Sequence, residues 1–485
     1  MDELASKLDE VTAAFRRRLD EVVVAMLQSR TPQDFSAAER TLVELAQGTS
    51  SDVVAFVVQT LSADVGVRRG ALAEVRERAS DGGIEMRLER DRETEFQTLG
   101  GKNVVVKTSY ATARPRGAAR SGRGASGTGV YPVLDLLGIS ERGTPALRLR
   151  VGHAVSEANS VTSARELLAA SGIEVDHKGA LRWTYGVAED ALLGRAEGIR
   201  TTLESATTGP LAGRRVVAAV DGGRINVRRR VPGRPKKGGR KKFVTEWREP
   251  KVLTIYVVGP DGKRDRTIPP VLDGTMGDAD AVFELLAYHL MRLGVASATE
   301  LVLVGDGAPW IWARGQRLRE RVGVCAERFI EIVDYFHVSE RLSEVADAQT
   351  EWSEEERKAW HRRQKDQLKL GNVETIEGAL RLLYKHKKNE LKSQMDYWER
   401  NRERLRYGGW RARGIPIGSG AVESAVRRVI NLRLKGASVA WLEDHAEGVL
   451  HLRAYAKSGR WTELEGTVLA HCRWRPTVRS AHQGA

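Results

Sequence analysis

The sequence predicts a multidomain α/β protein, in which a layered domain of strands and helices follows a mainly helical N-terminal region. The chain has 485 residues, whereas a single domain usually contains about 150. From residue 214 onward, short apolar runs typical of buried strands alternate with amphipathic helical stretches. We therefore expect a sheet flanked by helices in the second half of the chain.

The N-terminal region is predicted to be helical over 1–82 and again over 131–210. Within the first part, Thr31 and Pro32 mark a helix start, because proline is favoured in the first helical turn. Apolar residues then recur at helical spacing. The second part has the same character, with stretches such as ARELLAASGI.

Residues 83–130 separate these two helical parts and are predicted to hold a small β element. Two β-like runs, 84–99 and 102–110, flank a Gly-Gly pair, which indicates a hairpin. The stretch 111–129 is rich in Gly, Arg and Ser and has no large apolar residue, so we expect a basic loop or linker there.

The layered domain is predicted to come in two parts, 211–337 and 414–460, separated by a charged helical insertion at 338–413. Its strands are expected within 214–223, 251–259, 266–274 (weaker), 300–307 and 327–337, with a helix at 278–293. The second part opens with the Gly-rich turn GIPIGSG and continues as helices at about 420–434 and 439–457. Residues 461–485 are assigned to a C-terminal tail.

Composition favours a nucleic-acid partner. The formal net charge is +14 and the pI about 9.8, which implies an anionic partner, although a generic basic surface would give the same numbers. Two cysteines without a CxxC motif argue against a disulfide framework or a cysteine zinc site. No apolar run approaches the ~18 residues of a membrane helix, and the acidic, helical N-terminus is unlike a signal peptide. We expect an intracellular protein with no membrane partner.

Two carboxylates are the strongest candidates for chemistry. Asp221 and Asp306 each end a buried strand, and each is followed by glycine. If these strands are parallel neighbours, the two carboxylates converge and repel, so that a proton or a cation must lie between them. Oxygen ligands suit magnesium, and Glu423, after the Gly-rich turn, could complete a two-metal site. The alternative for each aspartate alone is a turn or a helix cap.

Basic residues surround these candidates. The run 224–242 contains ten basic residues and no acid, and it lies between the first two strands of the domain. We expect it to bind DNA, although basic runs are often only solvated loops. Its members are Arg224, Arg228, Arg229, Arg230, Arg234, Lys236, Lys237, Arg240, Lys241 and Lys242. Four further positions could hold DNA backbone after Glu423, namely Arg427, Arg428, Arg433 and Lys435.

At these residues the chain resembles the ISKra-type DDE transposases of bacterial insertion sequences. The segments that carry the resemblance occur in the family's order and cover most of 214–461; they are VDGGRI, EWREPKVLTIY, VGDGAPWIW, VDYFHVSERL, IPIGSGAVESAVRRVINLRLKGASVAW and LHLRAYAKSGRW. The resemblance implies an RNase H-like mixed sheet flanked by helices and interrupted by a helical insertion. It also implies that Asp221, Asp306 and Glu423 are the catalytic triad and hold two Mg²⁺ ions, for which Mn²⁺ could substitute.

The resemblance extends to the region after the fifth strand, where Asp334 and His337 look like a site-supporting element. The alternatives are a helix N-cap for Asp334 and a packing role for His337. Many relatives have a small zinc ribbon before YPVLDLLGI, but its cysteines are absent here, so no zinc is expected. The tryptophans of the insertion (Trp352, Trp360, Trp398 and Trp410) could stack on an unpaired base, but core packing is the more common role.

The expected function is that of an insertion-sequence transposase, an Mg-dependent polynucleotidyl transferase and endonuclease. It would recognise transposon ends through 131–210, cut a phosphodiester bond and join the freed end to target DNA. Because two ends must be held together, we expect a homodimer or larger assembly on DNA, in the bacterial cytoplasm near the nucleoid. The alternatives are an RNase H-like nuclease or resolvase without strand transfer, and an inactive DNA-binding remnant.

Overall fold

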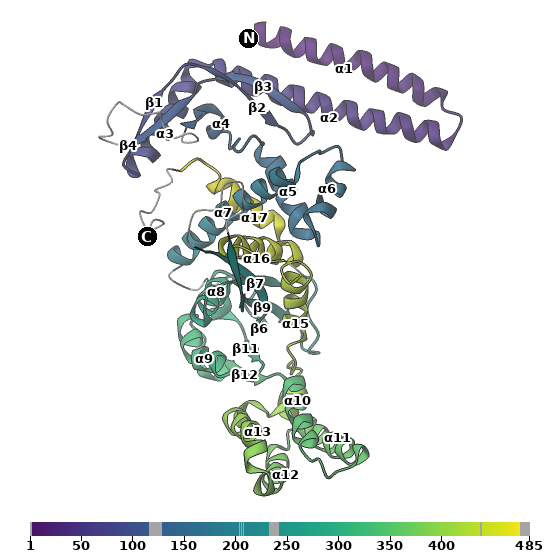
Figure 1. Cartoon of the computed structure of the whole chain (residues 1–485), viewed down its shortest axis with the longest axis vertical. Coiled ribbons are helices and arrows are strands. Elements are labelled where there is room, and N and C mark those ends of the chain that lie inside the picture. Colours follow the sequence, from purple (N-terminus) through teal and green to yellow (C-terminus); the bar gives the residue numbers. More distant parts are fainter. Residues whose placement is uncertain are drawn as a thin grey trace. The chain divides into compact units, whose positions relative to one another are not determined.

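The structure, a computed structural model, describes residues 2–115, 129–202, 204, 206, 208–231, 242–436 and 439–475. The chain forms two compact units (Figure 1). One comprises Met1–Gly194 with Glu463–Ala485, and the other comprises Arg195–Thr462. None of the helices in the described ranges has the length and apolar character that a membrane-spanning segment requires.

The first unit begins with the predicted helices, which are α1 (Asp2–Gln28), α2 (Pro32–Ala63) and α3 (Val65–Asp81). Helices α1 and α2 pack side by side (Figure 1). The helix start predicted at Thr31 is confirmed, because the Thr31 hydroxyl accepts a hydrogen bond from the Asp34 N–H at 3.1 Å and Pro32 occupies the first turn.

The small β element contains the predicted hairpin, formed by antiparallel strands β2 (Arg92–Gln97) and β3 (Asn103–Thr108). The prediction of a loop throughout 111–129 was wrong at its ends. Residues 111–115 form β4 (Ala111–Pro115), which pairs with β1 (Ile84–Leu88) and with β5 (Gly129–Val130). Ala111 is buried against α3, so a small side chain serves as a core residue here. Residues 116–128, the rest of that prediction, lie outside the described residues.

The remaining helices of the first unit are α4 (Pro132–Leu136), α5 (Pro145–Glu157), α6 (Val161–Ala169) and α7 (His177–Thr201), with the boundary to the second unit falling inside α7. The segment assigned to a C-terminal tail also contains a helix, α17 (Trp461–His471). Leu464 and Val468 are buried and lie one turn apart, and this spacing is the signal that marks the helix.

The second unit is built on a five-stranded sheet of order β10-β9-β6-β11-β12. Its strands are β6 (Arg215–Gly222), β9 (Lys251–Val258), β10 (Val271–Thr275), β11 (Glu300–Gly305) and β12 (Phe329–Val333). Strand β9 is antiparallel to β6 and β10, whereas β11 is parallel to both β6 and β12. The expected α/β fold with a mixed sheet is therefore confirmed.

Alternate residues of β6 define the two faces of this sheet. Val216, Ala218 and Val220 pack in the core that also contains α8 (Ala279–Arg292) and α9 (Pro309–Arg321). Val217 and Ala219 pack in the opposite core, with residues of α10 (Tyr335–Asp347) and α15 (Gly420–Val426). Helix α16 (Glu443–Ser458) packs against β10.

The predicted helical insertion lies between α10 and α15 (Figure 1). It contains α11 (Glu354–Leu370), α12 (Val373–His386), α13 (Lys388–Asn401) and α14 (Tyr407–Ala412). Trp360 and Trp398 are buried, and Trp352 and Trp410 pack against the same core. All four tryptophans therefore have the packing role that their helical spacing favoured.

A second hairpin follows β6, formed by antiparallel strands β7 (Ile225–Arg230) and β8 (Phe243–Arg248). Trp441 pairs with its outer edge, since the Arg228 N–H donates to the Trp441 carbonyl at 2.8 Å and the Trp441 N–H donates to the Asn226 carbonyl at 3.0 Å. The helix predicted from residue 439 consequently begins only at Glu443, as α16.

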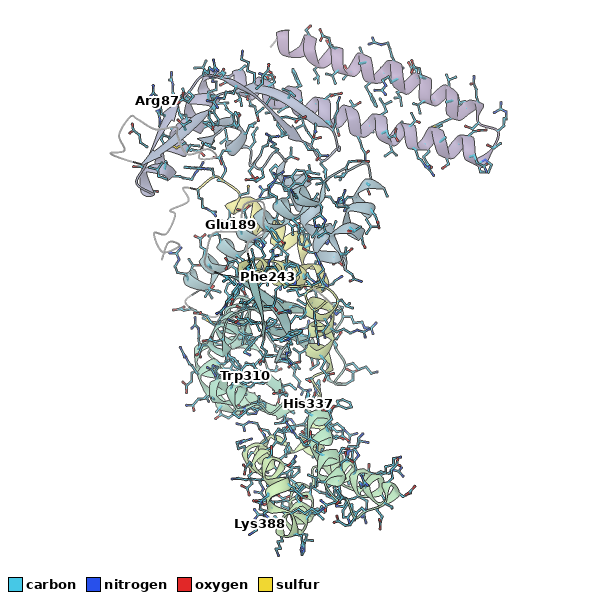
Figure 2. The ribbon with its side chains drawn as sticks, in the orientation of Figure 1. Arg87, Glu189, Phe243, Trp310, His337 and Lys388 are labelled. Atoms are coloured by element: carbon cyan, nitrogen blue, oxygen red, sulfur yellow. The ribbon has the colours of Figure 1, made fainter. Side chains whose placement is uncertain are left out.

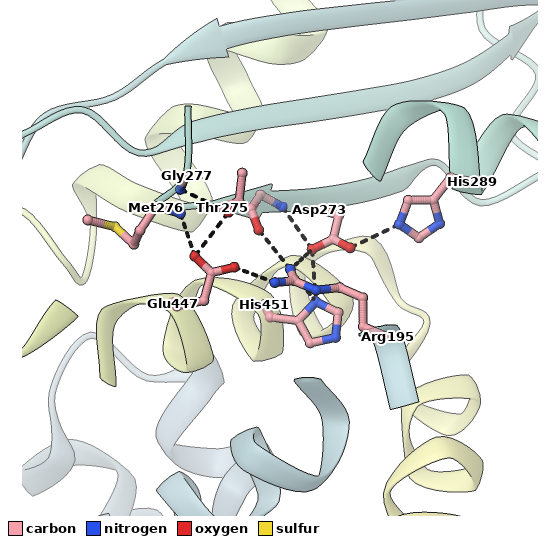
Figure 3. A network of polar contacts seen from close by, with 9 residues as sticks. Arg195, Asp273, Thr275, Met276, Gly277, His289, Glu447 and His451 are labelled. Atoms are coloured by element: carbon pink, nitrogen blue, oxygen red, sulfur yellow. Dashed lines mark hydrogen bonds and ion pairs between the residues drawn. The ribbon is translucent and has the colours of Figure 1, made fainter. Parts of the chain in front are cut away.

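A buried polar network ties α7, α8 and α16 to β10 (Figure 3). Asp273 is fully buried, and its carboxylate lies 2.9 Å from His289 Nε2 and 2.8 Å from His451 Nδ1. Arg195 lies beside the same carboxylate and pairs with Glu447. Burial alone would raise the pKa of Asp273, but the charges of His451 and Arg195 and the histidine hydrogen bonds hold it well below its ordinary value.

We predict that Asp273→Asn lowers the stability of the second unit by about 3 kcal/mol, because it removes one of the two carboxylates that pair with the buried Arg195 and the charge that His289 and His451 contact. Asp280→Asn is the matched control, since Asp280 is exposed and pairs with Arg314 at the surface, where ion pairs contribute little. Thermal unfolding followed by circular dichroism should separate the two variants. Equal melting temperatures would contradict the structural importance of the network.

Candidate active site

The sheet aligns three aspartates at the carboxyl ends of parallel strands. The printed register pairs Ala219 with Val304 and Val304 with Ile332. Two residues further along each strand are Asp221, Asp306 and Asp334. Alternate residues of a strand face the same side of a sheet. Each aspartate lies an even number of residues after Val217, Val302 or Ile332, which belong to the face that α10 and α15 cover. Neighbouring strands are about 4.8 Å apart, and the condition that Asp221 and Asp306 follow adjacent parallel strands is met.

Asp221 is influenced by the charges of the other candidate residues. Burial, together with the negative charges of Asp306 and Glu423, raises the pKa of Asp221 to about 6. A hydrogen bond from the Gly222 N–H, at 2.7 Å, and the charge of His337 act in the opposite direction. Four of the predicted site residues are therefore close enough to interact electrostatically.

Asp306 is positioned by the helical insertion. Its own carboxylate accepts a hydrogen bond from the Ala308 N–H at 2.9 Å, at the start of α9. Its carbonyl oxygen accepts a hydrogen bond from the Tyr397 hydroxyl of α13 at 3.0 Å. The next residue, Gly307, has φ +92, and a Cβ there would lie 2.5 Å from the Tyr397 ring. Glycine is thus required by both backbone conformation and packing.

Asp334 caps α10 and also accepts a hydrogen bond from the start of α15. Its Oδ1 accepts hydrogen bonds from the N–H groups of Phe336 and His337, at 2.5 and 3.1 Å, and so caps α10. Its Oδ2 accepts a hydrogen bond from the Ser419 N–H, at the start of α15. The cap interpretation of Asp334 is correct, and the second bond makes the residue a link between β12 and the helix of Glu423.

Glu423 lies in the first turn of α15, as the sequence predicted, and its side chain is exposed. The Ser419 hydroxyl donates a hydrogen bond to Glu423 Oε1 at 3.2 Å. The helix predicted over 420–434 is shorter than expected, because α15 ends at Val426 and continues as a π-helix over Arg427–Asn431. Such π segments are frequent near functional sites.

His337 is not a core residue. Its side chain is 38% exposed and its Nδ1 lies 3.4 Å from Glu340 Oε2. It lies at the start of α10, where the sheet meets the insertion (Figure 2), and its charge lowers the pKa of Asp221. His337 is thus only partly buried, and its charge acts on Asp221.

The donor set has the chemistry that magnesium requires. Asp221, Asp306 and Glu423 offer only carboxylate oxygens, and the repulsion that raises the pKa of Asp221 is relieved when a cation binds. In the ranges that the structure describes, no three acidic, His or Cys side chains are close enough to form a complete ligand set. The three residues match the preference of magnesium for oxygen ligands in charge and chemistry, and Glu423 lies on an exposed turn of α15.

The predicted DNA-binding residues divide into four groups. Arg224, Arg228, Lys242, Arg427 and Lys435 are exposed. Arg229, Arg428 and Arg433 already have protein contacts, with Glu246 at 2.8 Å, with the carbonyls of Ser424 and Lys457, and with the Trp441 ring. Arg230 ends β7, while five members of the basic run lie outside the described residues, namely Arg234, Lys236, Lys237, Arg240 and Lys241.

Sequence reasoning missed the residues that hold the acids in place. Tyr397, Asn401 and Ser419 all make such contacts, and Asn401 is fully buried with its amide donating toward the Gly307 carbonyl at 3.5 Å. Tyr397 and Asn401 lie one helical turn apart in α13, which places both side chains on the same face. A Tyr and an Asn at this spacing are a weak signal, and only the tertiary fold identifies their partners.

Comparisons of the chain with protein-family models, with curated proteins and with solved structures found no match.

We predict that Asp221→Asn raises the melting temperature above pH 6. In the folded chain the pKa of Asp221 is raised from 3.8 to about 6, so folding favours its protonated form and the ionised form opposes folding. The penalty is absent below pH 3.8, grows between pH 3.8 and 6, and is constant above. We expect a gain of roughly 1–2 kcal/mol at pH 7.5, because partial exposure weakens the effect.

Mg²⁺ provides a second measurement on the same two proteins. At pH 7.5 it should raise the melting temperature of the wild-type chain and have a smaller effect on Asp221→Asn. At pH 4 the two proteins should melt together. An Asp221→Asn variant that is less stable than wild type at pH 7.5 would contradict the proposed charge repulsion.

Proposed function

We propose that this chain is a DNA transposase of an insertion sequence, which binds transposon ends and catalyses phosphodiester cleavage and strand transfer. The observation that carries the proposal is the alignment of Asp221 and Asp306 on adjacent parallel strands, with Glu423 on the helix that covers the same face and all three coupled by charge. The resemblance of the surrounding segments to ISKra-type DDE transposases supports the same function.

The order of elements supports an RNase H-like catalytic domain within this proposal. Three antiparallel strands, β10, β9 and β6, are followed across the sheet by the parallel strands β11 and β12. The insertion interrupts the chain after the fifth strand, between the second acid and the third. Both features are expected of a DDE transposase with a helical insertion, and a plain RNase H-like nuclease would not need the insertion.

Mg²⁺ ions held by Asp221, Asp306 and Glu423 would supply the charge that stabilises the attacking and leaving oxygens of a phosphodiester. The chain itself fixes the acids. Tyr397 holds the Asp306 turn from the insertion, and Asp334 holds the start of the Glu423 helix. In the first step water attacks phosphorus and the bond to the 3′ oxygen breaks, which frees a 3′-OH. In the second step this 3′-OH attacks the phosphorus of a target phosphodiester, and the bond from that phosphorus to the 3′ oxygen of the target strand breaks, which leaves a 3′-OH on the target.

Replacing any acid of the triad should abolish this chemistry. We predict that Asp221→Asn, Asp306→Asn and Glu423→Gln each lower Mg²⁺-dependent cleavage and joining by more than about a hundredfold while DNA binding persists. Glu284→Gln is the control, since Glu284 is an exposed carboxylate on α8, which covers the other face. Activity should need Mg²⁺, accept Mn²⁺ and fail in Ca²⁺.

Three outcomes would separate this proposal from its alternatives. Cleavage without joining of labelled DNA ends to a target plasmid would indicate a nuclease or resolvase. Metal-independent DNA binding without cleavage would indicate an inactive remnant. Near-normal strand transfer by one of the triad variants would remove that residue from the site.

The exposed cations of the β7–β8 hairpin should contact DNA phosphates. Each lost phosphate contact lowers the slope of log affinity against log salt by about 0.9. We predict that replacing Arg228 and Lys242 together by alanine lowers the slope by up to about 1.8. Arg229→Ala should have a smaller effect, because Glu246 already pairs with Arg229.

Lys263→Ala is the matched control for this measurement. Lys263 is exposed, but it follows β9 at the end of the sheet opposite Asp221, because Val258 pairs with Arg215. Fluorescence anisotropy titrations at several salt concentrations give the slopes. If the double variant keeps the wild-type slope, the hairpin cations are solvated and do not bind DNA.

A further inference from the structure

An open pocket of about 540 Å³ lies immediately beyond Asp221. Gly222 and Gly223 line it from the end of β6, Trp247 from β8, and Val426, Asn431 and Lys435 from α15 and the segment that follows it. The pocket therefore lies between the first acid and the helix that carries the third acid. Its volume is in the range of small-ligand sites.

Trp247 gives the pocket an aromatic wall. Its side chain is 54% exposed, although the Arg224 guanidinium lies over the ring at 4.9 Å. The tryptophans of the insertion pack in or against a core. A large aromatic ring exposed to water is energetically unfavourable. Bases of single-stranded nucleic acid stack on aromatic surfaces that lie next to a cation.

The charges around the pocket favour an anionic ligand. Arg248 pairs with Glu443 at 2.9 Å, and Glu249 pairs with Lys251 at 3.1 Å, so these charges are already balanced. Arg224 and Lys435 also line the pocket, and within the described part of the chain neither has a carboxylate partner. Two such cations beside an exposed aromatic ring suit a ligand that combines a planar base with phosphate.

We propose that this pocket takes one unpaired nucleotide of a DNA strand, with its base stacked on Trp247 and its phosphates near Arg224 and Lys435. The inference rests on the proposed function, since it assigns a nucleotide subsite next to the proposed catalytic acids. An unpaired base held there fixes the strand on one side of Asp221. Trp247 is thus a positioning residue that selects DNA whose strand end is open.

Phe243 provides a matched control on the same strand. It lies four residues before Trp247, is 53% exposed, and has the Arg228 guanidinium over its ring at 5.9 Å. It does not line the pocket. Comparing the two aromatic residues therefore distinguishes binding of a base in a specific pocket from nonspecific DNA binding by any exposed ring on a basic hairpin.

The test compares two labelled DNA probes of one sequence, a fully paired duplex and the same duplex with a short unpaired 3′ end. Binding of the full-length protein is measured by fluorescence anisotropy in Ca²⁺, so that no cleavage is required. We expect wild type to bind the open-ended probe about tenfold more tightly. Trp247→Ala should bring the ratio close to one, whereas Trp247→Phe should keep most of it and Phe243→Ala all of it.

A 2-aminopurine base in the unpaired end reports stacking directly. Its fluorescence should fall on binding to wild type and to Phe243→Ala, and should change much less with Trp247→Ala. Circular dichroism melts verify that the variants are folded. Trp247→Phe keeps the proposal testable even if Trp247→Ala does not fold, because an aromatic ring of smaller area should reduce the ratio without removing it.

Each result has a separate meaning. A wild-type ratio near one, an unchanged ratio in Trp247→Ala, or an equal loss in Phe243→Ala would overturn the base pocket and leave the transposase proposal standing. If the wild-type protein bound neither probe, the proposed function would fail and the pocket with it. Loss of strand transfer in the triad variants, together with a wild-type ratio near one, would support the transposase and exclude the base pocket.

Discussion

The site depends on the register of three parallel strands, which places Asp221, Asp306 and Asp334 side by side at the carboxyl ends of these strands. Carboxylates at neighbouring strand ends repel one another, and the three aspartates differ in the hydrogen bonds that offset this repulsion. Asp334 is buried and accepts hydrogen bonds from three backbone N–H groups. Asp306 accepts one hydrogen bond, from the N–H of Ala308, which precedes α9. Asp221 has only the Gly222 N–H, and its pKa is raised by burial and by the charges of Asp306 and Glu423. The unrelieved repulsion is therefore concentrated on Asp221.

The same strand ends attach the parts of the chain that come later in the sequence. The insertion reaches back through Tyr397 to the Asp306 carbonyl and through Tyr407 to the Val333 carbonyl, at 3.0 and 2.8 Å. The Gly-rich turn reaches back through Ser419 to Asp334. A displacement of the insertion would consequently change the position of Asp306, while a displacement of α15 would change the position of Asp334. The hydrogen bond from Tyr397 thus holds the insertion next to Asp306.

Much of the fold could be predicted because its signals are local. Apolar runs that end in Asp221 and Asp306, the Gly-Gly turn between β2 and β3, and the helical periodicity of the insertion all depend on neighbours in sequence. The strand at 111–115 was missed because its core residue is an alanine, which has no β-like signal of its own. The contact between Tyr397 and Asp306 spans 91 residues, so no local pattern could reveal it. The roles of Asp334 as a contact for both α10 and α15 and of Trp247 as an exposed ring likewise appear only once the strands are assembled.

The β7–β8 hairpin lies between the strand of Asp221 and the segment that follows Glu423. It begins two residues after Gly223, and its outer edge pairs with Trp441, which follows the segment of Glu423 and Lys435. Gly223 touches this segment as well, since a Cβ there would lie 2.4 Å from Ile430 Cδ1 in the π-helix. The pocket lined by Trp247 is therefore bounded on one side by the strand of the first acid and on the other by the segment that follows the third. A ligand in this pocket would contact both the end of β6 and the segment after Glu423. Binding of the ligand would therefore affect the distance between Asp221 and Glu423.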